Sequence, residues 1–334
     1  MSARRTVHVI FTGGTISMRV DPGTGAAVPS LSGEEIVARV RGLRREARLV
    51  LEDYARLPGP HVTPHWMWRL KARVASVLED PLVDGVVVTH GTDTLEETAF
   101  LLDLTLEGPK PVVFCGAMRT LSEPGWDGPA NLMTAVRTAV HPDSRERGVL
   151  VAVGEEVLAA AEAYKWHTQR LAAFRSPEGP LAVLDRGQVV YRRPPFHAPC
   201  LKAKRLVTDV DLHLMAAGVD DALIRASVDR GARGLVLAAT GCGNVPPSVL
   251  PGLRAALASR LPVILASRCA EGRVSPAYGY EGGGRMLREM GVILGGDLPG
   301  PKARIKLMVA LGLTPDLLEI RRIFEGDSSY SPRS

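Results

Sequence analysis

The chain has few cysteines, and their spacing matches neither a metal site nor a disulfide framework. Its 334 residues contain four cysteines, none of them in a Cys-x-x-Cys pair. Zinc knuckles and small disulfide scaffolds need closely spaced cysteines, so the spacing excludes both. We therefore predict reduced, mostly buried thiols, no metal site and a cytoplasmic protein. The four residues are Cys115, Cys200, Cys242 and Cys269.

Long apolar segments and aromatic residues are also scarce. No apolar run approaches the roughly 20 residues of a transmembrane helix, and Met1–Val9 lacks the apolar segment and cleavage site of a signal peptide. Only 5% of the residues are aromatic, and the basic residues behind the net charge of +5 are scattered. Nucleic-acid grooves combine a basic stripe with aromatic side chains. We therefore expect neither a membrane nor a nucleic acid as a partner.

The composition and the apolar pattern favour a layered α/β fold. Hydrophobic residues make up 46% of the chain, and its length favours two domains over one. Short apolar strands alternate with amphipathic helices, which predicts parallel sheets covered on both faces. The expected strands are Val7–Phe11, Gly85–Thr89, Pro111–Cys115, Gly148–Val153, Gly234–Ala239 and Pro262–Ser267.

The helix ends carry readable signals. Thr63 and Pro64 predict an N-cap followed by proline in the first helical position, and Thr94 with Glu97 predicts a capping box. The expected helices after these and later signals include Leu95–Leu106, Ala222–Arg230 and Lys302–Leu311.

A stretch rich in proline and charge separates the two series of elements. Residues 187–206 show no sustained period, so we expect a linker there. The N-terminal domain would then span residues 1–186 and the C-terminal domain residues 207–325. The polar residues 326–334 are expected to form a flexible tail.

Three polar turns that contain glycine follow predicted strands. They are Thr12–Thr15, His90–Asp93 and Thr240–Asn244. In open α/β sheets, ligands bind beyond the carboxyl ends of the strands. We therefore expect one site that is built from several of these turns.

The first turn offers a hydroxyl beside a flexible backbone. Gly13 and Gly14 allow a sharp turn, and Thr12 could attack a carbonyl carbon while neighbouring amides stabilise the oxyanion. One such amide is typically worth roughly 3 kcal/mol of the barrier. The turn lacks the glycine spacing of a dinucleotide site and the Gly-Lys pair of a phosphate loop. Taken alone, its spacing favours an ordinary turn that caps a helix.

The second turn places a hydroxyl beside a carboxylate. Thr92 and Asp93 are suited to proton transfer or to holding an ammonium group, and a nearby lysine with a lowered pKa could take the hydroxyl proton. Their spacing leaves open whether they serve chemistry or cap the next helix.

Two further groups are weaker candidates. His61 and His65 have the spacing of a zinc pair, but Pro64 between them and the absence of a glutamate exclude the H-E-x-x-H motif. The glycines Gly282–Gly284 predict a flexible loop and not a phosphate cradle.

Taken together, the segments resemble the bacterial L-asparaginases, a family of asparaginases and glutaminases, over nearly the whole chain. The motifs agree in order and approximate spacing. They are VIFTGGTI at Val9–Ile16, VVVTHGTDTLEETAFLL at Val86–Leu102, FCGAMR and DGPANL within Phe114–Leu132, AYKWHT at Ala163–Thr168, TGCGN at Thr240–Asn244 and PKARIKL at Pro301–Leu307.

The resemblance implies an α/β fold with a larger N-terminal, flavodoxin-like parallel-sheet domain and a smaller C-terminal α/β domain. It also implies hydrolysis of L-asparagine, in some members L-glutamine, to the acid and ammonia without a cofactor. Members of the family form homodimers or homotetramers, with each site completed by a neighbouring subunit.

The same resemblance implies roles for five residues. Thr12 would be the nucleophile that forms an acyl-enzyme. Thr92, Asp93 and Lys165 would form a second catalytic set that activates water or threonine, and Thr92 and Asp93 would also bind the substrate. Asn244 would reach the site of the neighbouring subunit.

The sequence departs from the family pattern at two places. Ala26 and Ala27 stand where many members carry a tyrosine that helps to activate the first threonine. The segment Leu57–Thr63 lacks the serine that usually binds the substrate carboxylate, so the amides of Gly59 or His61 are the candidates to replace it. The glutamate that members lend to a neighbouring subunit has no secure match, and Glu281 is the nearest residue.

These departures keep two alternatives open. The same fold could act on glutamine, a D-amino-acid amide or a larger amide. The chain could also be a catalytically weak protein that binds aspartate or asparagine.

Overall fold

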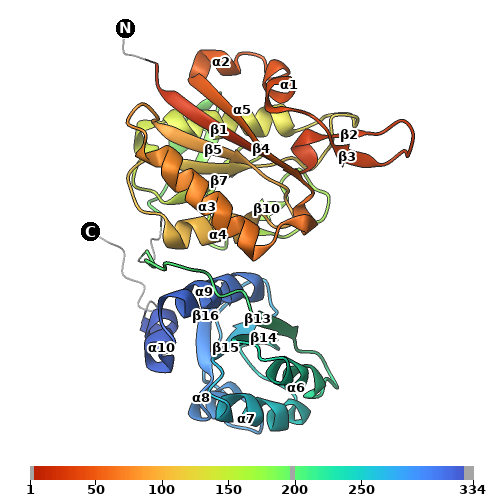
Figure 1. Ribbon diagram of the computed structural model, residues 1–334, viewed down its shortest axis with the longest axis vertical. Coiled ribbons are helices and arrows are strands. Elements are labelled where there is room, and N and C mark those ends of the chain that lie inside the picture. The colour runs from red at the N-terminus through yellow and green to blue at the C-terminus, as the bar shows by residue number, and fades with distance from the viewer. Residues whose placement is uncertain (1–3, 196–199, 327–334) are drawn as a thin grey trace. The chain divides into compact units, whose positions relative to one another are not determined.

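The computed structural model describes residues 4–195 and 200–326. The chain divides into two compact units, Met1–Cys200 and Leu201–Ser334 (Figure 1). Each unit is a helix-covered sheet, and the prediction of two α/β units with a larger, mostly parallel first sheet is confirmed.

The first unit contains an eight-stranded sheet in the order β12-β11-β8-β7-β6-β5-β1-β4. Five neighbouring strands are parallel, and they are β4 (Arg48–Leu57), β1 (Thr6–Gly13), β5 (Gly85–Thr89), β6 (Val112–Cys115) and β7 (Val149–Val153). The other three extend the sheet in antiparallel pairs, and they are β8 (Glu156–Ala159), β11 (Ala182–Asp185) and β12 (Gln188–Tyr191).

The order of the parallel strands locates the expected ligand site. Numbered along the chain, they follow the sequence 2-1-3-4-5, which is the flavodoxin-like order. The direction of winding reverses between β1 and β5, and ligands of such sheets bind outside the carboxyl ends at that point. The turns that follow β1 and β5 are the two that carry Thr12 and Thr92.

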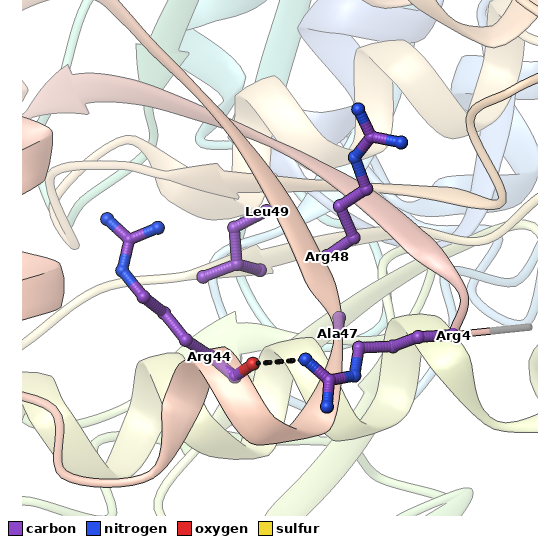
Figure 2. Close-up of a pocket in the computed structure, with 5 residues that line it drawn as sticks. All are labelled: Arg4, Arg44, Ala47, Arg48 and Leu49. Carbon is purple, nitrogen blue, oxygen red and sulfur yellow. Dashed lines mark hydrogen bonds between the residues drawn. The ribbon is translucent and has the colours of Figure 1, made fainter.

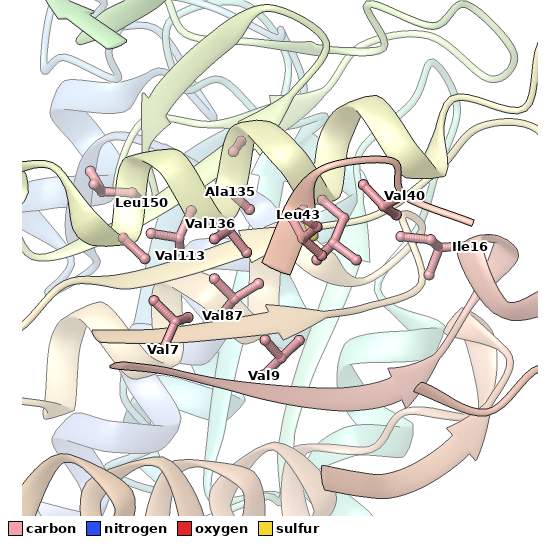
Figure 3. Close-up of a cluster of buried hydrophobic side chains, with 14 of the residues drawn as sticks. Val7, Val9, Ile16, Val40, Leu43, Val87, Val113, Ala135, Val136 and Leu150 are labelled. Atoms are coloured by element: carbon pink, nitrogen blue, oxygen red, sulfur yellow. The ribbon is translucent and has the colours of Figure 1, made fainter. Parts of the chain in front are cut away.

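Helices cover both faces of this sheet (Figure 1). One face is covered by α3 (Pro64–Glu79) and α4 (Leu95–Thr105), and the other by α1 (Gly33–Ala38), α2 (Leu43–Glu46) and α5 (Gly128–Val140). Figure 3 shows apolar side chains of the strands packed against α5. Every residue of β5 and of β7 is buried, as a strand between two helical layers requires.

The second unit is smaller and its sheet is wholly parallel. The order is β13 (Val210–Leu214), β14 (Gly234–Ala239), β15 (Val263–Ser267) and β16 (Ile293–Pro299). Its helices are α6 (Ala222–Asp229), α7 (Leu250–Ala258), α8 (Gly284–Glu289), α9 (Gly300–Leu313) and α10 (Leu317–Glu325).

The structure differs from the expected boundaries in the region of the linker. Residues Gln188–Tyr191, expected within the linker 187–206, form β12 and pair with β11. Four residues are too few for a clear alternating pattern, and the prolines that follow them are more typical of a linker than of a strand. Of the expected tail 326–334, residues 327–334 lie outside the described residues.

The two predicted helix starts have different outcomes. Thr63 caps α3 as predicted, because its side chain accepts from the Trp66 amide. Thr94 makes no such bond, and its hydroxyl donates instead to the Gly59 carbonyl, 2.9 Å away, so the capping box was a wrong prediction. Tertiary contact thus overrides a local signal.

Of the four cysteines, Cys115 is buried, Cys200 and Cys242 are half-buried, and Cys269 is exposed. Burial raises the pKa of the Cys115 thiol to about 12, which keeps it protonated. The expectation of mostly buried thiols is therefore wrong. Within the described part of the chain, no helix is long and apolar enough to cross a membrane.

The turn after β5 is anchored by a buried histidine. His90 is fully buried, and its Nδ1 lies 2.8 Å from the Gly91 carbonyl oxygen. A carbonyl can only accept, so Nδ1 carries the proton, and Nε2 faces the Thr98 hydroxyl at 3.0 Å. Burial lowers the pKa of His90 to about 4, so the ring is neutral in the folded protein at neutral pH.

His90 predicts a loss of stability in acid. Its pKa rises to about 6.5 on unfolding, so its contribution is complete above pH 6.5 and is lost as the pH falls towards 4. We expect the free energy of unfolding to fall by about 3 kcal/mol over this interval through His90 alone. Urea unfolding at a series of pH values measures this fall in the free energy of unfolding.

The matched variants are His90→Gln and His65→Gln. The first removes the buried titrating ring and should flatten the decline, whereas the second changes an exposed histidine and should leave the decline as in the parent chain. An equal slope in the His90→Gln variant and the parent would contradict the assignment.

Candidate active site

Backbone contacts between glycines bring three turns together. Gly13 and Gly14 have φ values of +109° and +77°, which L side chains rarely adopt. A Cβ on Gly14 would lie 2.5 Å from Gly91 Cα, and a Cβ on Gly91 would lie 2.7 Å from Gly59 Cα. The turns after β1 and β5 and the turn at residues 58–61 therefore pack directly on each other. The predicted convergence of the first two turns is confirmed.

Thr12 lies near the end of β1, where the pairing with β4 shifts register, and it is almost fully buried, with 2% of its surface exposed. Its hydroxyl donates to the Thr89 carbonyl at 2.7 Å. Among the described residues, no titratable side chain is hydrogen-bonded to it. The Gly14 amide donates to the Leu57 carbonyl at 2.9 Å, so this amide is already engaged and does not face an oxyanion.

Thr92, Asp93 and Lys165 form a compact cluster. Lys165 Nζ lies 2.9 Å from Thr92 Oγ1 and 2.7 Å from Asp93 Oδ1. Thr92 is buried, and the Lys165 side chain is 16% exposed, whereas that of Asp93 is 56% exposed. The amine therefore contacts the hydroxyl in a mostly dry place, while the carboxylate reaches solvent. The fold thus brings the lysine to two partners that precede it by 73 and 72 positions in the chain.

Glu96 holds the backbone of Lys165. Lys165 lies in the two-residue strand β9 (Tyr164–Lys165), which pairs with β10 (Phe174–Arg175). Its amide donates to a carboxylate oxygen of Glu96, in the first turn of α4. The turn and helix that carry Thr92 and Asp93 therefore also hold the lysine. The sequence motif contains Glu96, but its contact with Lys165 depends on a hairpin far along the chain.

A pocket of about 320 Å³ opens over this cluster. It is lined by Asp93, Glu96, Lys165, Trp166, His167 and Thr168. Trp166 is held in place by Arg175, whose Cζ lies 3.4 Å from the ring centroid. Two carboxylates on one wall are suited to an ammonium group, and the amine and hydroxyl beside them are suited to proton transfer.

Asp127 supports Thr92 through the turn after β6, a role that the sequence did not reveal. Its carboxylate accepts from the amides of Met118 and Arg119 at 2.9–3.1 Å. The turn it closes includes Gly116, where a Cβ would lie 2.9 Å from Thr92 Cγ2. A larger residue at this position would collide with the Thr92 side chain.

The structure shows where the two departures from the family pattern lie. Ala26 and Ala27 lie in the exposed hairpin of β2 (Met18–Val20) and β3 (Ala27–Pro29). In the turn that replaces the expected serine, the His61 amide already donates to the Pro58 carbonyl at 3.0 Å. Of the two amides expected as carboxylate donors, that of Gly59 remains.

Asn244 lies in the second unit, after β14, and is half-buried. Its Oδ1 accepts from the Gly284 amide at 3.3 Å, and its backbone pairs with Thr240. The prediction of a flexible glycine loop is wrong, because Gly282–Gly284 are buried and a Cβ on any of them would overlap the backbone of the neighbouring loops. Glu281 beside them is exposed.

The acidic, histidine and cysteine side chains do not gather into a metal centre in the described part of the chain. In residues 4–195 and 200–326, no group of three or more His, Cys, Asp or Glu side chains could hold a metal ion.

Comparison with known proteins matches each half of the chain to a family model. The family model "Asparaginase, N-terminal" matches residues 6–197, and the model "Glutaminase/Asparaginase C-terminal domain" matches residues 209–324. A protein named probable L-asparaginase, from Deinococcus radiodurans, is 38% identical over 95% of this chain and 96% of its own length. A glutamyl-tRNA(Gln) amidotransferase subunit from Methanopyrus kandleri is 36% identical over 95% of this chain and 72% of its own length.

A solved structure agrees with the fold. The probable cytoplasmic L-asparaginase of Campylobacter jejuni superposes with a TM-score of 0.86 and 29% identity, over 96% of this chain and 99% of that one. The two family models match in order and cover most of the chain, and the relatives match it over nearly its full length. This chain therefore belongs to the asparaginase family.

Proposed function

We propose that this chain hydrolyses L-asparagine to L-aspartate and ammonia through a threonine nucleophile and an acyl-enzyme. The observation that carries the proposal is the position of Lys165 Nζ, within hydrogen-bonding distance of both Thr92 and Asp93. A hydroxyl, an amine and a carboxylate in contact are a proton-transfer set. Membership of the asparaginase family supports an amide as the bond that is hydrolysed.

In the first step, Thr12 Oγ attacks the side-chain amide carbon of asparagine. The hydroxyl proton passes to the leaving nitrogen, the C–N bond breaks, and ammonia departs from an ester on Thr12. The bond from Thr12 to the Thr89 carbonyl orients the hydroxyl for this attack. The proton must move by way of the substrate or a water molecule, because no titratable side chain among the described residues is bonded to Thr12.

In the second step, water hydrolyses the ester. An uncharged Lys165 amine at the same 2.9 Å would accept the Thr92 hydroxyl proton, and Thr92 would take a proton from the attacking water. The ester C–O bond breaks, aspartate forms, and the proton held by Lys165 returns by way of Thr92 to the Thr12 oxygen, which restores the hydroxyl and the amine. Asp93, 2.7 Å from the amine, stabilises the ammonium form that results.

The substrate's polar groups have separate partners in this proposal. The Asp93 carboxylate accepts from the α-ammonium group, and the Thr92 hydroxyl contacts the side-chain amide. The Gly59 amide donates to the α-carboxylate in place of the absent serine. Asn244 contributes from the second unit of a neighbouring subunit, so the proposal includes a homodimer or homotetramer. No cofactor enters these steps.

A cytoplasmic location is part of the same proposal. It is supported by the similarity to the Campylobacter jejuni protein, which is described as a probable cytoplasmic L-asparaginase.

Action on another amide is the second candidate. The exposed alanines at 26 and 27 leave the hairpin without the aromatic ring that would narrow the site. The relative from Methanopyrus kandleri carries the name of an amidotransferase subunit, an activity other than asparagine hydrolysis.

A panel of amides separates the two candidates. We expect L-asparagine to give the highest kcat/KM for ammonia release, ahead of L-glutamine, D-asparagine and a larger amide. The two carboxylates of the pocket favour an α-ammonium group in reach of Asp93, so an amide without that group should react slowly. Saturable aspartate binding without release of ammonia from any amide would instead indicate a binding protein.

Single substitutions test the residue roles. Thr12→Ala should lower kcat on L-asparagine by more than about 10³-fold, because it removes the nucleophile. Lys165→Met keeps much of the bulk but loses the amine and should lower kcat by about 10²- to 10⁴-fold. Steady-state ammonia release measures both, with Thr24→Ala in the exposed hairpin turn as a control that should retain activity. Activity in Thr12→Ala close to that of the parent would eliminate Thr12 as the nucleophile.

Glu96 is proposed as a positioning residue that acts through Lys165. Glu96→Ala removes the acceptor of the Lys165 amide and should lower kcat by about 10- to 100-fold with little change in KM, since small displacements of a catalytic group are costly. Glu96→Gln keeps an acceptor oxygen and should stay near the parent. Thermal unfolding of both variants, run in parallel, tells misplacement from loss of folded protein. Equal kcat in Glu96→Ala and the parent would contradict the role.

A further inference from the structure

A pocket of about 480 Å³ opens on the first unit and is lined mainly by arginine (Figure 2). Its lining residues are Arg4, Arg44, Ala47, Arg48 and Leu49. Arg4 precedes β1, Arg44 lies in α2, and Arg48 begins β4. The volume is within the range of small-molecule sites, which is about 300–1,000 Å³.

The positive charge of this pocket is largely uncompensated. Arg44 pairs with Glu34 at 2.6 Å, but both side chains are more than half exposed, so the pair is weak. Arg4 donates to the Arg44 carbonyl at 3.1 Å, a neutral partner. Arg48 has no hydrogen-bonded or ion-paired side-chain partner among the described residues. The three guanidinium groups thus have one carboxylate as an ion-pair partner among the described residues, and Figure 2 shows them pointing in different directions around Leu49 and Ala47.

The pocket also has an apolar part. Ala47 is buried, and Leu49 is half-buried. Figure 2 shows Leu49 between the Arg44 and Arg48 side chains, with the Arg4 guanidinium beside the Arg44 carbonyl. A ligand could therefore place charged groups on the arginines and an uncharged portion over Leu49.

The pocket lies at the opposite end of β1 from Thr12. Arg4 precedes Thr6, the first residue of β1, and Thr12 is next to its last. At about 3.3 Å per residue, the two ends are roughly 20 Å apart. A ligand here would not touch the residues proposed for catalysis.

We propose that this pocket binds a small molecule with two or more phosphate groups. Guanidinium groups form paired, charge-assisted hydrogen bonds with phosphate oxygens, and a ligand with several phosphates can contact more than one of these separate arginines. A single carboxylate would contact fewer of them. The site requires no part of the proposed amidase chemistry.

Isothermal titration of the full chain with ATP and with inorganic tripolyphosphate tests the proposal. Both probes should bind saturably at one site per chain, more weakly at high salt, and adenosine should not bind. Tighter binding of ATP than of tripolyphosphate identifies the nucleotide body as a contact with Leu49, and equal binding identifies the phosphates alone. Excess L-aspartate should displace neither probe, because the two sites are separate.

Matched arginine variants tell the pocket from the general positive charge. Arg48→Ala should weaken binding of both probes at least tenfold, because Arg48 lines the pocket without a partner. Arg45→Ala removes the same charge from an exposed neighbour of Arg44 that does not line the pocket, and it should leave binding unchanged. Equal weakening in the two variants, or no saturable binding in the parent chain, would overturn the proposal.

Discussion

The contact of Gly14 on Gly91, and of Gly91 on Gly59, is the constraint on which the site of the first unit depends. At Gly14 and at Gly91 the backbones approach so closely that a Cβ would overlap the opposing chain. The contact sets the distance between the turn that carries Thr12 and the turn that carries Thr92. The turn after β6 adds a similar constraint. A Cβ on Gly116 would overlap Thr92, and the Asp127 carboxylate holds the backbone of this turn. A small group of glycines therefore positions hydroxyls that come from separate strands.

The two halves of the proposed machinery differ in how they are held. Thr92 and Lys165 contact each other directly, and the first turn of α4 holds the lysine backbone through Glu96. Among the described residues, the Thr12 side chain is hydrogen-bonded only to the Thr89 carbonyl, and the hairpin of β2 and β3 that follows it is exposed. The Thr92 set is thus built on rigid elements, whereas the surroundings of Thr12 end in a solvent-exposed hairpin. This asymmetry accords with the proposed mechanism, in which the Thr12 proton moves by way of the substrate or a water molecule.

The fold places its charges in different environments. The neutral His90 ring lies beneath the site in a fully buried position, where burial lowers its pKa, while the carboxylates that face the pocket reach solvent. At the other end of the sheet, arginines gather where strands begin. Opposite ends of β1 therefore carry pockets of different charge, one lined by two carboxylates and a lysine and one by three arginines.

Sequence alone determined the class of the fold and most of the buried strands. Apolar runs such as Gly85–Thr89 and Gly234–Ala239 match β5 and β14 residue for residue, because strands covered on both faces leave a continuous apolar record. It did not predict several other strands, among them β4, an edge strand with mixed exposure, and β12, a short strand before prolines, since neither carries a sustained period. The resemblance to the asparaginase family, and not spacing alone, pointed to Thr12, Thr92, Asp93 and Lys165.

Only the tertiary structure decided how those residues meet. Thr94 reads as a helix cap, yet its hydroxyl donates to Gly59, a partner 35 residues away that no local pattern reveals. The hold of Glu96 on Lys165, the support of Thr92 by the Asp127 turn and the gathering of Arg4, Arg44 and Arg48 all join segments distant in the chain. Local patterns record burial and backbone preference, whereas these contacts depend on which strands become neighbours in the sheet.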